Sequence, residues 1–112
     1  MPREATDLLQ GTLELLILRL LRAGDLNGWD IMQRIRVMTG DVLSVTPGAL
    51  YPALHRLEDR GWIASFWGTS DNNRRARYYR LTTAGRRALE AQTTRWQALT
   101  RAVNRILLPE PE

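Results

Sequence analysis

Residues 46–82 read TPGALYPALHRLEDRGWIASFWGTSDNNRRARYYRLT, a helical pattern followed by a hairpin pattern. Thr46 and Pro47 form a helix start, because threonine caps the first turn and proline suits the first helical position. Three leucines then recur at intervals of four and three before a glycine, which predicts a helix over about 47–60. Pro52 has no N–H for the carbonyl four residues earlier, so we expect this helix to begin late or to bend there.

The second half of this stretch predicts a β-hairpin. Residues 62–67 and 77–81 combine aromatic residues with an alternating pattern, as strands do. Residues 68–75 between them have turn chemistry and no apolar side chain, so the tip of the hairpin should be long and exposed.

Two helices are predicted before residue 46. Residues 8–23 place apolar residues around almost the whole circumference of a helix, which ends at Gly24. Such a helix must be covered on both sides, so we expect a second copy of the chain to cover the side that the core leaves open. A short helix follows from the capping residue Asn27 to Gly40.

Residues 83–107 predict one long helix that carries a heptad seam and therefore requires a partner helix. The seam residues are Leu89, Trp96, Leu99, Val103 and Ile106. Residues 109–112 are predicted to be a disordered tail.

The composition favours a single basic domain. The chain has 112 residues, 44% of them hydrophobic, and its 16 basic residues, all arginine, outnumber 12 acidic ones to give a net charge of +4. Residues 50–105 hold eleven arginines against four acidic residues, a net +7. This distribution favours a polyanionic partner, although an all-arginine surface is equally consistent with genome composition.

Several classes of function are disfavoured. The chain has no cysteine and one histidine, so we expect no disulfide, no metal site and no cofactor. No nucleophile motif or phosphate loop is present, and the adjacent Glu58 and Asp59 point about 100° apart on a helix, so we do not expect an enzyme. The apolar run 13–21 is too short to span a bilayer, and no secretory signal is recognisable, so we expect no membrane partner and a cytoplasmic location.

Three helices followed by a hairpin is the order of a winged helix-turn-helix, in which the third helix enters a DNA groove beside the wing. The fold class expected is mainly α with a small β-hairpin and a long C-terminal helix. Small residues at the start of the third helix allow close approach to DNA, and arginines and amides at the wing tip suit phosphate or minor-groove contact. Tyr51 could instead be a core residue and His55 an ordinary surface residue. The predicted DNA contacts are Trp29, Thr46, Gly48, Ala49, Tyr51, Pro52, His55, Arg56, Asn72, Asn73, Arg74, Arg75 and Arg77.

Four segments in this order resemble the PadR family of bacterial transcriptional regulators: QGTLELLIL, GWDI, PGALYPALHRLE and RARYYRLT, at residues 10–18, 28–31, 47–58 and 75–82. The resemblance implies a homodimeric repressor that binds a pseudo-palindromic operator in double-stranded DNA. It implies a DNA-binding domain over 1–82 and a dimerisation helix over 83–108 that pairs with the partner's first helix. Trp29 stands where a tyrosine is common in the family.

The resemblance also implies two sets of residues at the subunit interface. The predicted dimer contacts are Leu9, Leu13, Leu16, Leu89, Trp96, Leu99, Val103 and Ile106. Similar short members bind flat aromatic molecules between the subunits against a tryptophan, which implies an aromatic small-molecule effector here. Its predicted contacts are Leu8, Leu15, Thr93, Trp96 and Thr100. For Trp96 we favour the alternative, packing in the dimer core, because a large aromatic residue at a seam position usually packs.

Two alternatives to DNA binding stay open. A winged helix can serve as a protein-interaction module without sequence-specific DNA binding, in which case neutralising the wing arginines would leave function intact. RNA binding usually places aromatic residues on an exposed sheet or loop, and the wing tip has none.

Overall fold

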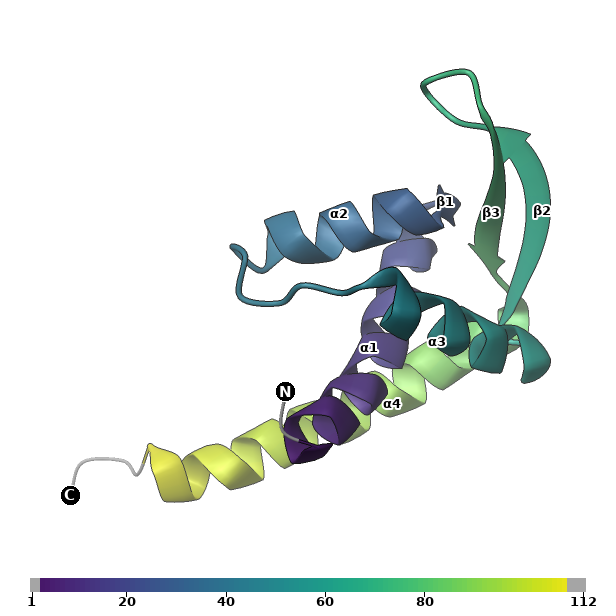
Figure 1. Cartoon of the computed structure of the whole chain (residues 1–112). Coiled ribbons are helices and arrows are strands. Elements are labelled where there is room, and N and C mark those ends of the chain that lie inside the picture. Colours follow the sequence, from purple (N-terminus) through teal and green to yellow (C-terminus); the bar gives the residue numbers. More distant parts are fainter. Residues whose placement is uncertain (1–2, 109–112) are drawn as a thin grey trace.

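The structure, a computed structural model, describes residues 3–108, with side chains from residue 11 onward. The predicted tail 109–112 and the side chains of Leu8 and Leu9 lie outside the described part. The elements in chain order are α1 (Arg3–Ala23), β1 (Leu26–Asn27), α2 (Gly28–Met38), α3 (Pro47–Asp59), β2 (Ile63–Thr69), β3 (Arg75–Leu81) and α4 (Thr83–Leu107) (Figure 1). This is a winged helix-turn-helix followed by a long C-terminal helix, and it confirms the predicted fold class.

The sheet has three antiparallel strands in the order β1-β3-β2, whereas the sequence predicted two. β1 consists of only Leu26 and Asn27, which pair with the two tyrosines of β3. Two residues are too short to show an alternating pattern, so sequence periodicity missed this strand. β2 and β3 are also longer than predicted, and the loop at the wing tip shortens to residues 70–74.

The hydrophobic core lies where α1, α2 and α3 meet the base of the sheet. Its fully buried side chains include Ile17, Ile31 and Leu54 from the three helices. Leu13 and Leu89, predicted to contact a partner subunit, are 1% and 2% exposed within this single chain. That prediction is wrong for both residues, because their own chain already covers them.

Proline does not delay the start of α3. The helix begins at Pro47 after the Thr46 cap and continues through Pro52, so the predicted late start is wrong. The carbonyl that Pro52 leaves without a donor belongs to Gly48, which is exposed, so water can bond to it.

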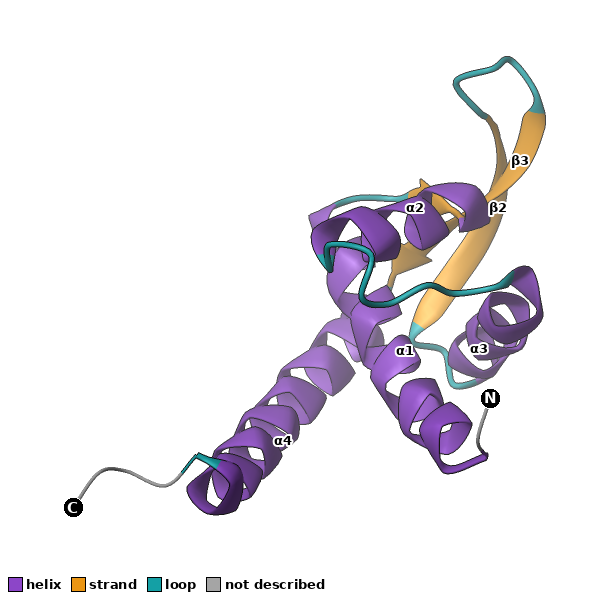
Figure 2. Cartoon of the chain, turned by 60° about the vertical axis from the view of Figure 1, so that its left-hand side comes forward, coloured by secondary structure: helices purple, strands orange, loops and turns teal. Residues whose placement is uncertain are grey.

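α4 is fixed at its first turn and projects from the rest of the chain (Figures 1 and 2). The side-chain oxygen of Thr82 accepts a hydrogen bond from the Gly85 N–H at 3.0 Å, and its hydroxyl donates to the Gly61 carbonyl at 2.6 Å. From this anchor the helix extends the molecule to 58 Å in its longest dimension, against 30 and 24 Å in the others. Trp96, at 44% exposed, begins an uncovered apolar stripe along its second half.

Candidate nucleic-acid interface

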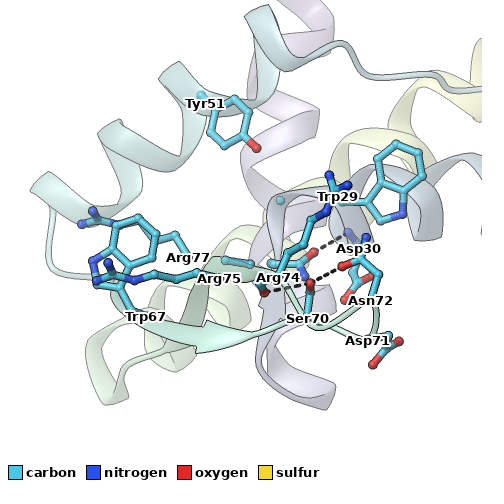
Figure 3. Close-up of a pocket in the computed structure, with 13 residues that line it drawn as sticks. Trp29, Asp30, Tyr51, Trp67, Ser70, Asp71, Asn72, Arg74, Arg75 and Arg77 are labelled. Carbon is cyan, nitrogen blue, oxygen red and sulfur yellow. Dashed lines mark hydrogen bonds between the residues drawn. The ribbon is translucent and has the colours of Figure 1, made fainter.

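A cleft of about 510 Å³ separates the wing from the starts of α2 and α3 (Figure 3). It collects predicted residues from three elements that are distant in sequence. Its lining residues are Asn27, Gly28, Trp29, Asp30, Tyr51, Trp67, Ser70, Asp71, Asn72, Arg74, Arg75, Ala76 and Arg77. Three aromatic and three arginine side chains therefore share one concave surface.

The face of the wing that lines this cleft carries a tryptophan between two arginines. Side chains alternate along a strand, so Trp67 shares its face with the buried Ile63 and is paired across the hairpin with Arg77. The guanidinium carbon of Arg75 lies 4.3 Å from the centroid of the Trp67 ring, and that of Arg77 lies 5.8 Å from it. Both arginines are thus within the range of a cation–π interaction with the same indole.

Arg77 also joins the wing to the end of α3. Its Nη2 donates to Ser65 Oγ at 2.7 Å, the Ser65 hydroxyl donates to Glu58 Oε2 at 2.5 Å, and Arg77 lies 3.8 Å from the same carboxylate. Beside this group, burial raises the pKa of Tyr79, against an opposing effect of the Arg77 charge. The network fixes the angle between the wing and α3.

The tip of the wing is held by its own polar groups. The Ser70 N–H donates to the Arg74 carbonyl at 2.8 Å, and the Ser70 hydroxyl donates to Asn72 Oδ1 at 2.6 Å. Asn73 has a φ of 61°, a left-handed conformation that asparagine tolerates better than most residues. The two asparagines thus shape the turn, and the exposed Arg74 has no acidic partner among residues 11–108.

The DNA contacts predicted on and around α3 differ in how exposed their side chains are. Tyr51 is 46% exposed, and Gly48, Pro52 and His55 also face solvent. Ala49 packs partly against the core. The Thr46 side chain accepts the Ala49 N–H at 3.3 Å as the helix cap, and Trp29, 64% exposed, stands at the start of α2.

Arg56 is the exception, because it makes an internal ion pair. Its Nε donates to Glu14 Oε1 at 2.7 Å, and Arg60 Nη1 donates to Glu14 Oε2 at 2.8 Å. Burial alone would raise the pKa of Glu14, but the hydrogen bonds from the two arginines and their positive charges together lower it below its ordinary value. Arg56 therefore fastens α3 to α1 through its Nε, and its role as a DNA contact stays a prediction.

A second groove, of about 350 Å³, lies between α1 and α4, which diverge from their crossing point (Figure 2). Leu15 and Trp96, both predicted effector contacts, line it together with Leu99. Thr93 and Thr100 are not among the lining residues, and the Thr100 hydroxyl donates to the Trp96 carbonyl. The predicted dimer contact Leu16 packs partly against the core, whereas Leu99, Val103 and Ile106 are 57, 43 and 82% exposed.

The fold places the chain in the winged-helix class of proteins, and comparison with known proteins specifies the family. Residues 17–91 match the transcriptional regulator PadR-like family. An uncharacterized protein of Lysinibacillus sphaericus is 30% identical over 91 residues, which cover 81% of this chain and 84% of that protein. The negative transcriptional regulator PadR of Bacillus subtilis is 31% identical over 87 residues, 78% of this chain but only 48% of its own length.

Solved structures of transcriptional regulators have the same fold as this chain. A transcriptional regulator from Clostridium thermocellum superposes with a TM-score of 0.80 and 31% identity, covering 88% of this chain and 96% of its own. The chain belongs to the PadR family of transcriptional regulators. Members of this family are regulators rather than enzymes, in agreement with the sequence analysis. Within residues 3–108, no helix is both long and apolar enough to cross a membrane.

Sequence reasoning missed three residues of the site. Trp67, Ser65 and Glu58 were not predicted to act there, yet they hold the wing arginines. The alternating pattern of β2 could have placed Ser65 and Trp67 on the face of Ile63, toward α3. The Glu58 contact depends on how α3 packs against the sheet, which no local pattern encodes.

Proposed function

We propose that this protein is a homodimeric repressor that binds a pseudo-palindromic operator in double-stranded DNA. The observation that carries the proposal is the cleft, which Tyr51 of α3, Trp29 of α2 and the arginines of the wing line together. A recognition helix in the major groove would contact bases through its first turns, while the wing would contact the adjacent backbone. Repression is supported by the name of the Bacillus subtilis relative, a negative transcriptional regulator.

In this proposal residues 1–82 form the DNA-binding unit and α4 forms the dimer. The apolar stripe of Trp96, Leu99, Val103 and Ile106 is exposed on a helix that projects from the domain, and such a seam is typical of helix pairing. Pairing of α4 with the partner's α1 would place two α3 helices about one DNA turn apart, roughly 34 Å. The cytoplasm, where DNA is accessible, would be its location.

We further propose that a signal at the dimer seam changes this spacing and releases the promoter. A flat aromatic effector in the groove beside Leu15 and Trp96 is one such signal. The competing role of Trp96, packing in the dimer core, predicts that the groove closes when the partner binds.

The test is a selection of random duplex DNA with the purified protein at two salt concentrations, with the oligomeric state measured in parallel. We expect an enriched inverted repeat bound by a dimer. Arg74→Gln should weaken binding to all sequences and lower the log–log salt slope by about 0.9, the value for one phosphate contact. Arg101→Gln, which removes the same charge from α4, is the matched control and should leave the slope unchanged.

A second candidate function is a winged-helix interaction module. It predicts no enriched sequence, weak binding that disappears at moderate salt, and no difference between the Arg74 and Arg101 variants. That result would overturn the proposal.

A further inference from the structure

Both faces of the wing stack an arginine on an aromatic ring, but their electrostatics differ. On the outer face Arg80 lies 4.4 Å from the Phe66 centroid and pairs with Asp25 at 3.4 Å. On the inner face Arg75 lies 4.3 Å from the Trp67 centroid and has no acidic partner among residues 11–108. The inner stack therefore presents uncompensated positive charge to the cleft.

Packing in the hydrophobic core does not explain why a tryptophan stands at position 67. It is 56% exposed and lies toward the tip of β2, beyond the buried base of the sheet. An exposed tryptophan covers a large area at low conformational cost, and its ring face attracts guanidinium groups. Figure 3 shows it at one end of the cleft with Arg75 and Arg77, and Trp29 at the other end.

We infer that Trp67 is a positioning residue that holds Arg75 and Arg77 as a two-pronged clamp for the sugar-phosphate backbone of duplex DNA in the wing cleft. This inference rests on the proposed DNA-binding function, and in it Trp67 acts through the two arginines. Arg77 directs its Nη2 toward Ser65 Oγ and, at 3.8 Å, toward Glu58 Oε2, which leaves the Nε–H and Nη1–H groups of its guanidinium for a phosphate. A free arginine would lose rotamer entropy on binding, and stacking on the indole restricts it beforehand.

The experiment measures binding of a duplex of about 30 base pairs and random sequence across a salt series, with wild type, Trp67→Ala, Trp67→Phe and Arg80→Gln. Trp67→Ala keeps every charge, yet we expect it to weaken binding about fivefold, as loss of exposed cation–π contacts would. The salt slope should fall by up to about 1.8, the value for two phosphate contacts. Trp67→Phe should retain most of the affinity and most of the salt slope of the wild type. Arg80→Gln, on the opposite face of the wing, should leave the salt slope unchanged.

A measurement without DNA checks the mechanism. In wild type the side-chain protons of Arg75 should show upfield ring-current shifts in NMR spectra. Trp67→Ala should abolish these shifts, while the chemical shifts of the other wing residues should remain those of a folded hairpin. If the Arg74 variant lowers the salt slope but Trp67→Ala does not, DNA binding stands and the clamp is wrong. If wild type binds no duplex at all, the proposed function fails and the clamp fails with it.

Discussion

The ring of Tyr51 on α3 lies directly over Gly28 at the start of α2. A Cβ placed on Gly28 would come within 2.7 Å of the Tyr51 hydroxyl oxygen and 3.1 Å of the carbon that bears it. Glycine is required here for space, since its φ is not in the left-handed region. The contact joins the two helices of the helix-turn-helix at the edge of the cleft and sets where the half-exposed tyrosine points.

Gly28→Ala should displace Tyr51 without unfolding the domain, because the clash is with the end of a half-exposed side chain. We expect a small change in stability, within about 1 kcal/mol, and a two- to tenfold loss of operator affinity, the range for one hydrogen bond. Thermal melting and DNA titration measure the two effects. In a Tyr51→Ala background the glycine substitution should cost no further affinity, and an additive loss would show that it acts elsewhere.

Gly85→Ala should be far more damaging. A Cβ there would lie 2.0 Å from the Trp62 carbonyl oxygen, so the backbone of α4 would have to separate from the turn that precedes β2. We expect a loss of about 3 kcal/mol in the free energy of unfolding, measured by urea denaturation at fixed protein concentration. Gly24→Ala, with nothing within 4 Å of the added carbon, is the control and should change stability by less than about 0.5 kcal/mol. Equal stability of the two variants would refute the close approach.

Glu14 should make stability depend on pH. Burial raises its pKa, but the hydrogen bonds and charges of Arg56 and Arg60 together lower it by more, so its pKa in the folded state is below its ordinary value. A carboxyl of this kind stabilises the fold above its unfolded pKa, about 4.3, and loses that contribution as pH falls through the folded pKa. Glu14→Gln should therefore cost about 1–2 kcal/mol at pH 7, a value reduced by the partial exposure of both arginines. The stability difference between the two proteins should shrink as pH falls below about 4.3 and vanish once the pH is below the folded pKa of Glu14. A difference that stays constant through this acid range would contradict the ion-pair explanation.

The exposed stripe of α4 predicts how dimerisation can be broken. Val103→Asp places a charge where a partner helix would bury it, which should weaken the dimer at least about 100-fold, and operator binding with it. Thr94→Asp adds the same charge nine residues away, about 180° around the helix, and should leave the dimer intact. Sedimentation velocity over a range of protein concentrations distinguishes them. Full operator affinity in a monomeric Val103 variant would exclude the dimer mechanism.

Local patterns were sufficient for most of the fold. The Thr46-Pro47 start, the leucine spacing of α3 and the turn chemistry of the wing each depend on neighbours a few residues apart, and the structure has these elements where the patterns indicated. Within the basic residues 50–105, the arginines predicted at the wing, Arg74, Arg75 and Arg77, line the cleft.

Contacts between distant residues were not predictable in this way. Strand β1 exists only because Leu26 and Asn27 meet β3 about fifty residues later. Arg56 and Arg74 are both arginines near the predicted interface. Arg56 forms an ion pair with Glu14 of α1, whereas Arg74 has no acidic partner among residues 11–108. Leu13 and Val103 are both apolar residues predicted to contact a partner subunit, but Leu13 is buried in the core and Val103 is exposed. The sequence by itself determines the chemistry of each side chain and the local elements. Which residue each side chain contacts depends on how the helices pack against the sheet, and that packing involves the whole chain.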